Sequence, residues 1–175
     1  MGSLIAFRMA LAHAKYVEGV VAMSSTSRAP TQQVIEAFTR FYLGWVSTPT
    51  PAEELMNVAI LEWGGEPDVN SERAKIIKRD WTERYNGVVN VEGISESLNS
   101  RDDIVDRLGE INVPVLLIHG EKDTSWAIEE AEIERNALRD VELKTVKGIG
   151  HMVIFLREAN DVNVWIEEFL KKLGY

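Results

Sequence analysis

The hydrophobic positions near the start of the chain change from helical spacing to a continuous run. Leu4, Phe7 and Leu11 recur at helical spacing, which predicts a helix over residues 3–14. Residues 17–23 read VEGVVAM, a nearly continuous β-branched run that is typical of a strand buried on both faces of a parallel sheet. We therefore expect a helix followed by a central strand.

Residues 31–106 contain amphipathic segments at helical spacing and no convincing strand. Turn signals such as STPTPAEE, GGEPD and NGV separate these segments. The expected helices cover residues 32–46, 52–63, 71–85 and, less regularly, 94–108. This pattern predicts a helical layer inserted between the first strand and the remainder of the chain.

Beyond Leu108 the pattern alternates between short apolar runs and amphipathic segments. We expect strands at residues 113–118 and 141–146, and helices at about 126–139 and 158–173. Such alternation predicts βαβ units and a parallel sheet. The predicted fold class is α/β, with a three-stranded parallel sheet, flanking helices and a helical insertion. Its core would comprise residues 1–30 and 107–175, and the insertion residues 31–106.

Composition and charge narrow the possible functions. The chain contains no cysteine and only three scattered histidines, so we expect no metal centre and no other cofactor. A net charge of -9 opposes binding to nucleic acid or anionic lipid. No apolar stretch has membrane-spanning length, and the first residues lack the order of a secretory signal. We therefore expect no membrane association and a cytoplasmic location.

Two loops carry residues suited to acid–base chemistry. HGEKD at 119–123 directly follows a predicted buried strand, and GIGH places His151 after the next strand. Parallel strands joined by right-handed crossovers lie side by side, and open α/β sheets bind ligands at their carboxyl edge. Asp123 and His151 can therefore meet, and a buried carboxylate would then fix the tautomer and orientation of the imidazole. On its own, Asp123 would fit equally well as a turn or helix-capping residue.

These motifs together resemble the α/β-hydrolase superfamily. VPVLLIHGEKD is similar to the strand and loop that carry the family's triad acid, and GIGHMV is similar to the loop that carries its histidine. The order of acid before histidine matches the family, and the separation of 28 residues suits one helix plus one strand. The resemblance implies a serine hydrolase related to esterases, with a small-molecule acyl substrate and with Asp123 and His151 as catalytic residues.

The same resemblance interprets the start of the chain. The family's nucleophilic serine lies in G-x-S-x-G, on a sharp turn between a strand and a helix. Met1 and Gly2 match the last two positions of this motif, so the nucleophile would precede Met1, and Met1 would occupy an oxyanion-hole position. We therefore expect a truncated α/β-hydrolase, weak or inactive as an isolated chain.

Two other functions remain open at this point. The chain could be a non-catalytic binding or scaffold protein, or a minimal, weak esterase in which Ser3, Ser24 or Ser25 replaces the nucleophile. A sheet cut before residues 17–23 would also leave that strand with an open edge, which favours pairing with another chain. We therefore expect either a homo-oligomer or an N-terminal partner chain at this edge.

Several aromatic residues have two interpretations. Phe41, Trp45, Trp63, Trp81 and Trp126 could line a substrate pocket, and those within the helical insertion could equally form the core of the cap that such insertions make in this family. His119 and Gly120 are expected to have a structural role at the strand end. The acidic run at residues 129–134 is expected to be a solvated helix face.

Overall fold

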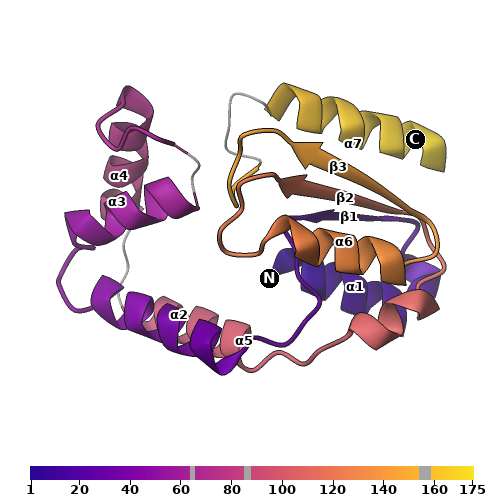
Figure 1. The fold of residues 1–175 in the computed structure, drawn as a ribbon, viewed down its shortest axis with the longest axis horizontal. Helices are drawn as coiled ribbons and strands as arrows, with labels where there is room; N and C mark the ends of the chain where they lie inside the picture. The colour runs from indigo at the N-terminus through magenta and orange to yellow at the C-terminus, as the bar shows by residue number, and fades with distance from the viewer. Residues whose placement is uncertain (64–65, 85–87, 154–158) are drawn as a thin grey trace. The chain divides into compact units, whose positions relative to one another are not determined.

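A single parallel sheet forms the centre of the computed structural model, which describes residues 1–63, 66–84, 88–153 and 159–175 (Figure 1). Its strands are β1 (Val20–Met23), β2 (Val115–Gly120) and β3 (Val141–Val146), in the order β1-β2-β3. Both pairings are parallel, with Val115 opposite Val20 on one side and opposite Val141 on the other. The predicted fold class, an α/β structure with a three-stranded parallel sheet and flanking helices, is confirmed.

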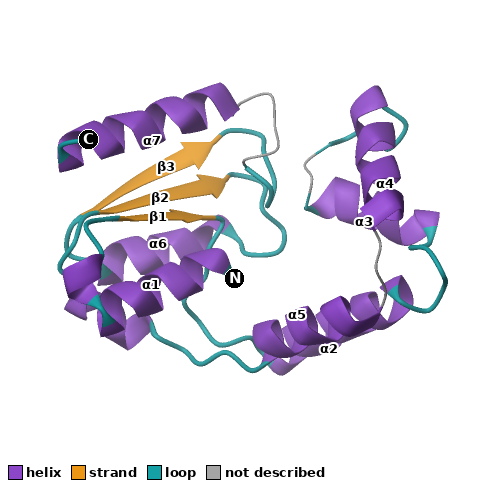
Figure 2. Ribbon diagram, turned by 180° about the vertical axis from the view of Figure 1, so that it is seen from behind, coloured by secondary structure: helices purple, strands orange, loops and turns teal. Residues whose placement is uncertain are grey.

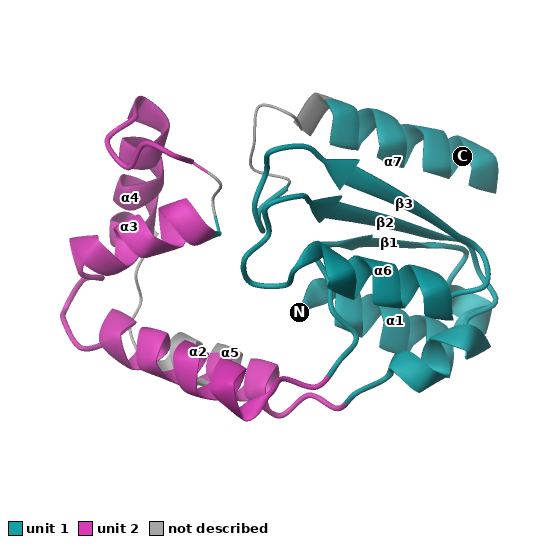
Figure 3. Ribbon diagram, viewed as in Figure 1, with its two compact units in different colours: residues 1–28, 63–65, 103–175 teal, residues 29–62, 66–102 magenta. Residues whose placement is uncertain are grey.

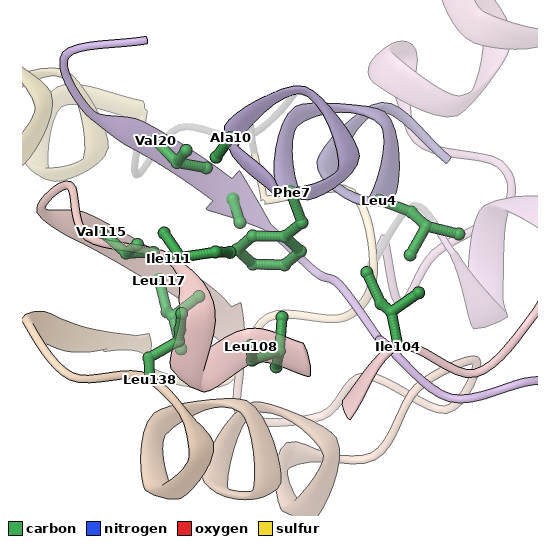
Figure 4. Packing of buried hydrophobic residues seen from close by; sticks show 11 residues of the cluster. Leu4, Phe7, Ala10, Val20, Ile104, Leu108, Ile111, Val115, Leu117 and Leu138 are labelled. Atoms are coloured by element: carbon green, nitrogen blue, oxygen red, sulfur yellow. The ribbon is translucent and has the colours of Figure 1, made fainter. Parts of the chain in front are cut away.

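Helices cover both faces of this sheet (Figure 2). One face packs against α1 (Gly2–Ala12) and α6 (Ile128–Ala137), and the other packs against α7 (Ala159–Leu173). All six residues of β2 are buried, and its four apolar side chains alternate between two hydrophobic clusters, Val115 and Leu117 in one and Leu116 and Ile118 in the other. The fully buried ring of Phe7 lies in the cluster under α1, beside Ile111 and Leu117 (Figure 4).

The bounds of the first two strands differ from the predicted ones, whereas the third strand, residues 141–146, has the predicted bounds. The first strand begins at Val20 rather than at residue 17, and a 3-10 turn, Ala14–Tyr16, precedes it. The second strand begins after Pro114, which has no N–H to donate to the sheet, and continues through His119 and Gly120. His119 and Gly120 therefore belong to the buried strand, and not to the loop that follows it.

The chain divides into two compact units, which we describe separately (Figure 3). Unit 1 contains the sheet and comprises residues 1–28, 63–65 and 103–175. The two ends of the inserted segment are adjacent within unit 1, since the Ile104 N–H donates to the carbonyl of Ser27 at 2.9 Å. A 3-10 helix, Val105–Glu110, then leads back to β2.

Unit 2 comprises residues 29–62 and 66–102 and is helical in its described part. Its helices are α2 (Gln32–Trp45), α3 (Glu53–Glu62), α4 (Glu72–Arg84) and α5 (Val88–Asn99). Thr31 caps α2, because its side chain accepts a hydrogen bond from the Val34 N–H. The predicted helix over residues 94–108 is wrong in its bounds, since α5 ends at Asn99. The role of unit 2 as a cap over a site stays a prediction.

None of the helices in the described part of the chain is both long and apolar enough to cross a membrane.

Candidate active site

The predicted acid and base lie on two loops that follow β2 and β3. Asp123 follows the carboxyl end of β2, and His151 follows the carboxyl end of β3. The loops are hydrogen-bonded to each other, because the Lys122 N–H donates to the carbonyl of Ile149 at 2.7 Å. The amino end of α1 lies at the same edge of the sheet, toward which the strand arrows point (Figures 1 and 2).

Gly120 allows the close approach of these two loops. A Cβ atom at this position would overlap the carbonyl oxygen of Gly150 and lie 2.6 Å from that of Ile149. Both obstacles are backbone atoms, so no side-chain rotation would relieve them. Gly148 turns the second loop with a φ of +73°, which favours glycine, and its N–H donates to the Glu121 carboxylate at 2.8 Å.

The Asp123 carboxylate is fully buried and uses both of its oxygens. Oδ1 accepts hydrogen bonds from the backbone N–H groups of Ser125 and Trp126, each at 2.9 Å. Oδ2 lies 2.9 Å from Nδ1 of His151. Asp123 therefore acts as a turn residue through one oxygen and pairs with the histidine through the other, so the two sequence interpretations of this residue are compatible.

His151 is oriented so that one ring nitrogen remains available for chemistry. Because the carboxylate only accepts, Nδ1 carries the proton in this pair, and the neutral ring then has an unprotonated Nε2. The side chain is 30% exposed, and no described side chain hydrogen-bonds to Nε2. An imidazole held in this way can take a proton from a hydroxyl and return it to a leaving group.

Residues 1–158 match the family described as serine aminopeptidase, S33. The chain belongs to this family of α/β-hydrolases. No curated protein sequence matches the chain significantly. The family assignment agrees with the order of the two loops, acid first and histidine second.

Solved structures share the fold of this α/β-hydrolase at low sequence identity. A thermophilic esterase from Thermogutta terrifontis is 18% identical with a TM-score of 0.78, over 99% of this chain and 63% of that one. A putative non-heme bromoperoxidase from Mycobacterium tuberculosis is 16% identical with a TM-score of 0.78, over 99% and 65%. An enol-lactonase from Burkholderia xenovorans LB400 is 18% identical with a TM-score of 0.77, over 98% and 63%. This chain thus spans less than two thirds of the length of these relatives.

Two of the serines considered as replacement nucleophiles are engaged elsewhere in the α/β-hydrolase core. Ser3 Oγ donates to the Met23 carbonyl and accepts from the Met23 N–H, each at 3.1 Å. Ser25 Oγ donates to Glu134 at 2.6 Å. Ser24 differs, because its buried Oγ has no hydrogen-bond partner and its φ of +45° is unusual for a residue with a side chain. Met1 precedes α1 and is exposed.

The aromatic residues predicted for a substrate pocket divide between the two units. Within unit 2, the ring of Trp45 lies 5.4 Å from that of Phe41 and 5.5 Å from that of Trp81, measured between centroids. Within unit 1, Trp63 and Trp126 contribute backbone groups near the site: the Trp63 carbonyl accepts from the Met152 N–H at 2.8 Å. A common substrate pocket for the five residues stays a prediction.

Two further polar side chains of unit 1 are buried, Glu134 and His119, and the sequence predicts a structural role only for His119. Glu134 was expected on a solvated helix face but is 1% exposed, so that expectation is wrong. Its carboxylate accepts from Ser25 and, at 2.7 Å, from Ser27. Burial raises the pKa of Glu134 from 4.5 to about 7, although the two hydroxyls favour its ionised form. The other side chain is His119, whose ring lies beside Asp123.

Proposed function

We propose that this chain supplies the acid and the base of a serine acyl hydrolase that acts on esters or similar acyl bonds of small molecules. The observation that carries the proposal is the 2.9 Å contact between His151 Nδ1 and the buried Oδ2 of Asp123, at the carboxyl edge of a parallel sheet. The esterase and the enol-lactonase among the structural relatives agree with this reaction class.

Each residue has one role in the proposed reaction. His151 Nε2 takes the proton from a serine hydroxyl as its oxygen attacks the acyl carbon, and then returns that proton to the leaving alcohol. Asp123 remains ionised, holds the Nδ1–H tautomer and stabilises the imidazolium formed in between. Water repeats the attack on the acyl-enzyme with His151 again acting as the base.

The nucleophile in this proposal is a serine outside residues 1–175. Two observations support this: Met1 and Gly2 match the end of the family's G-x-S-x-G turn, and the hydroxyls of Ser3 and Ser25 are already engaged. In the same arrangement Met1 would follow the nucleophile and provide an oxyanion-hole amide. The amino end of α1 lies at the edge of the sheet that this role requires.

A second candidate is a minimal esterase with Ser24 as nucleophile. The buried hydroxyl of Ser24 has no partner, and its positive φ directly follows β1, at the same edge as the acid and base. Unusual backbone conformations of this kind concentrate at functional sites. A non-catalytic scaffold is the third possibility, and the experiment below separates all three.

The proposal also gives the open edge of β1 a partner. The Val20 N–H donates to the Pro114 carbonyl just before β2, and the Ser24 N–H donates to the Ile118 carbonyl within β2. The backbone groups of Val21 and Met23 therefore face the other side. Ser3 satisfies those of Met23, which leaves Val21 as the position for strand pairing. We propose that an N-terminal segment pairs here, and that a second copy takes its place in the isolated chain. Sedimentation of residues 1–175 at micromolar concentration tests this pairing. A monomer that also unfolds cooperatively would contradict it.

The decisive experiment combines a serine-directed fluorophosphonate probe with an ester hydrolysis assay. It compares residues 1–175 with the same chain preceded by the residues that its gene encodes in frame upstream. We expect labelling only in the longer protein, at the serine directly before Met1, together with hydrolysis of p-nitrophenyl acetate. His151→Gln and Asp123→Asn in the longer protein should each reduce kcat by about 10³-fold or more.

Other outcomes assign the function differently. Labelling of residues 1–175 at Ser24 would establish the minimal esterase. A folded longer protein that is neither labelled nor active would overturn the hydrolase proposal in favour of the scaffold. An in-frame stop codon directly upstream of the Met1 codon, together with no labelling of residues 1–175, would also favour the scaffold over the hydrolase.

A further inference from the structure

We propose that His119 is a positioning residue, which holds the Asp123 carboxylate in place for His151 through its Nε2–H group. The role rests on the proposed function, since it assigns a task to the same acid and base. It explains why a polar ring occupies β2, a strand whose six residues are all buried. Burying a polar group in such a place is unfavourable unless the group makes defined polar contacts.

The tautomer of His119 follows from its contacts. The ring is 1% exposed, and its Nε2 lies 2.7 Å from the backbone carbonyl oxygen of Trp126. A carbonyl oxygen only accepts hydrogen bonds, so Nε2 must carry the proton. The same Nε2 lies 3.4 Å from Oδ2 of Asp123, which is too long for a good hydrogen bond but close enough for the N–H dipole to attract the carboxylate.

Trp126 closes a ring of contacts around the acid. Its N–H donates to Oδ1 of Asp123, while its carbonyl accepts from His119, whose Nε2 faces Oδ2. The carboxylate is thereby held at both oxygens from the buried side. Its Oδ2 lies between two histidines, with the buried His119 on one side and the partly exposed His151 on the other.

The geometry gives His119 an effect that packing alone would not have. Without the Nε2–H group, the Trp126 carbonyl loses its side-chain donor, and Oδ2 is held from the His151 side alone. The carboxylate can then rotate away, and the Nδ1–H of His151 exchanges with water more readily. Any role limited to filling space would leave this proton unaffected.

Replacement by amides of different length separates positioning from packing. In His119→Gln the amide nitrogen is separated from Cβ by the same number of bonds as Nε2, so it can reach the Trp126 carbonyl. In His119→Asn the amide nitrogen is one bond shorter and cannot. Both variants keep a polar, uncharged side chain, which makes them a matched pair, and His119→Leu removes the donor altogether.

Proton NMR of residues 1–175 with labelled histidine rings measures the result without any turnover. We expect the far-downfield Nδ1–H signal of His151 in the wild-type chain and in His119→Gln. In His119→Asn and His119→Leu we expect it to be lost or to exchange at least 10-fold faster, with the backbone amide spectrum preserved. Equal exchange in the four proteins would overturn the proposal, as would a folded His119→Gln that behaves like His119→Leu.

A measurement on the wild-type chain and on Asp123→Asn, both of which keep His119, covers the case in which the substitutions of His119 prevent folding. The proposal requires His119 to carry its proton on Nε2, and requires that signal to shift in Asp123→Asn. The proposal is refuted if Nε2 of His119 carries no proton, or if the Nε2–H signal has the same chemical shift in Asp123→Asn as in the wild-type chain. Because no nucleophile is needed, this result is independent of the labelling experiment: inactivity with the expected spectra would remove the hydrolase function and leave the ring of contacts established.

Discussion

Replacing Glu134 with glutamine should change how the stability of the chain depends on pH. The carboxylate is 1% exposed and accepts hydrogen bonds from Ser25 and Ser27, at 2.6 and 2.7 Å. Glutamine keeps the shape, can accept from one hydroxyl and donate to the other, and never ionises. The substitution therefore removes the titration while it retains the contacts.

The size of the effect follows from the raised pKa. Burial raises the pKa of Glu134 from 4.5 to about 7 in the folded chain. Since one pKa unit corresponds to about 1.4 kcal/mol, ionising this group in the folded chain costs about 3 kcal/mol more than in the unfolded chain. Between these two pKa values the unfolded chain binds fewer protons, so the free energy of unfolding falls as the pH rises and levels off above about pH 7.

Urea denaturation of wild type and Glu134→Gln at several pH values is the assay. From pH 5 to pH 8 the variant should gain about 2 to 3 kcal/mol relative to wild type, and no further gain is expected above that range. Glu129→Gln, at an exposed position of the same helix, is the control and should differ from wild type by a constant amount, within about 0.5 kcal/mol. A Glu134→Gln difference that is constant with pH would refute the reasoning.

Three further substitutions test other contacts in unit 1. Gly120→Ala places a Cβ against the Gly150 carbonyl and should destabilise the chain by about 1 to 3 kcal/mol in urea denaturation, with loss of the downfield His151 proton signal as the loops separate. Phe7→Ala should lower the free energy of unfolding by about 3 to 5 kcal/mol because the ring is fully buried. Ile5→Ala, on the exposed side of the same helix, should change it by no more than about 0.5 kcal/mol. Equal losses of stability in the two variants would show that the cluster under α1 is misassigned. Ser3→Ala frees both backbone groups of Met23, so sedimentation should show stronger self-association than wild type, and an unchanged profile would count against pairing at this edge.

The parts of the fold that local pattern determines were predictable. The apolar run VPVLLI predicts a strand that is buried on both faces, and every residue of β2 is buried. The alternation of apolar runs and amphipathic segments after Leu108 predicts a parallel sheet. The pairing of Asp123 with His151 could be anticipated from strand order alone, since both loops follow adjacent strands. The structure moves the strand bounds by a few residues without changing this arrangement.

The buried polar contacts were not predictable from local pattern. Glu134 lies in the segment IEEAEIERNA, where nothing in the local sequence distinguishes it from the other three acids of α6. What distinguishes it is the position of Ser25 and Ser27, more than 100 residues away along the chain. The sequence places His119 at the end of a strand but does not predict its contact with the Trp126 carbonyl, because that contact depends on the path of the following loop. Such contacts are set by tertiary structure, which single-sequence periodicity does not report.

The hydrogen bond between Ile104 and Ser27 makes the helical segment between them exchangeable. Because the two ends of that segment meet within unit 1, a short turn could join them without displacing β1, although it would remove the Trp63 carbonyl that accepts from the Met152 N–H beside His151. The same junction would accept helical segments of other lengths from related enzymes. Changes in the length of the inserted segment can therefore leave the order of the three strands in the sheet unchanged.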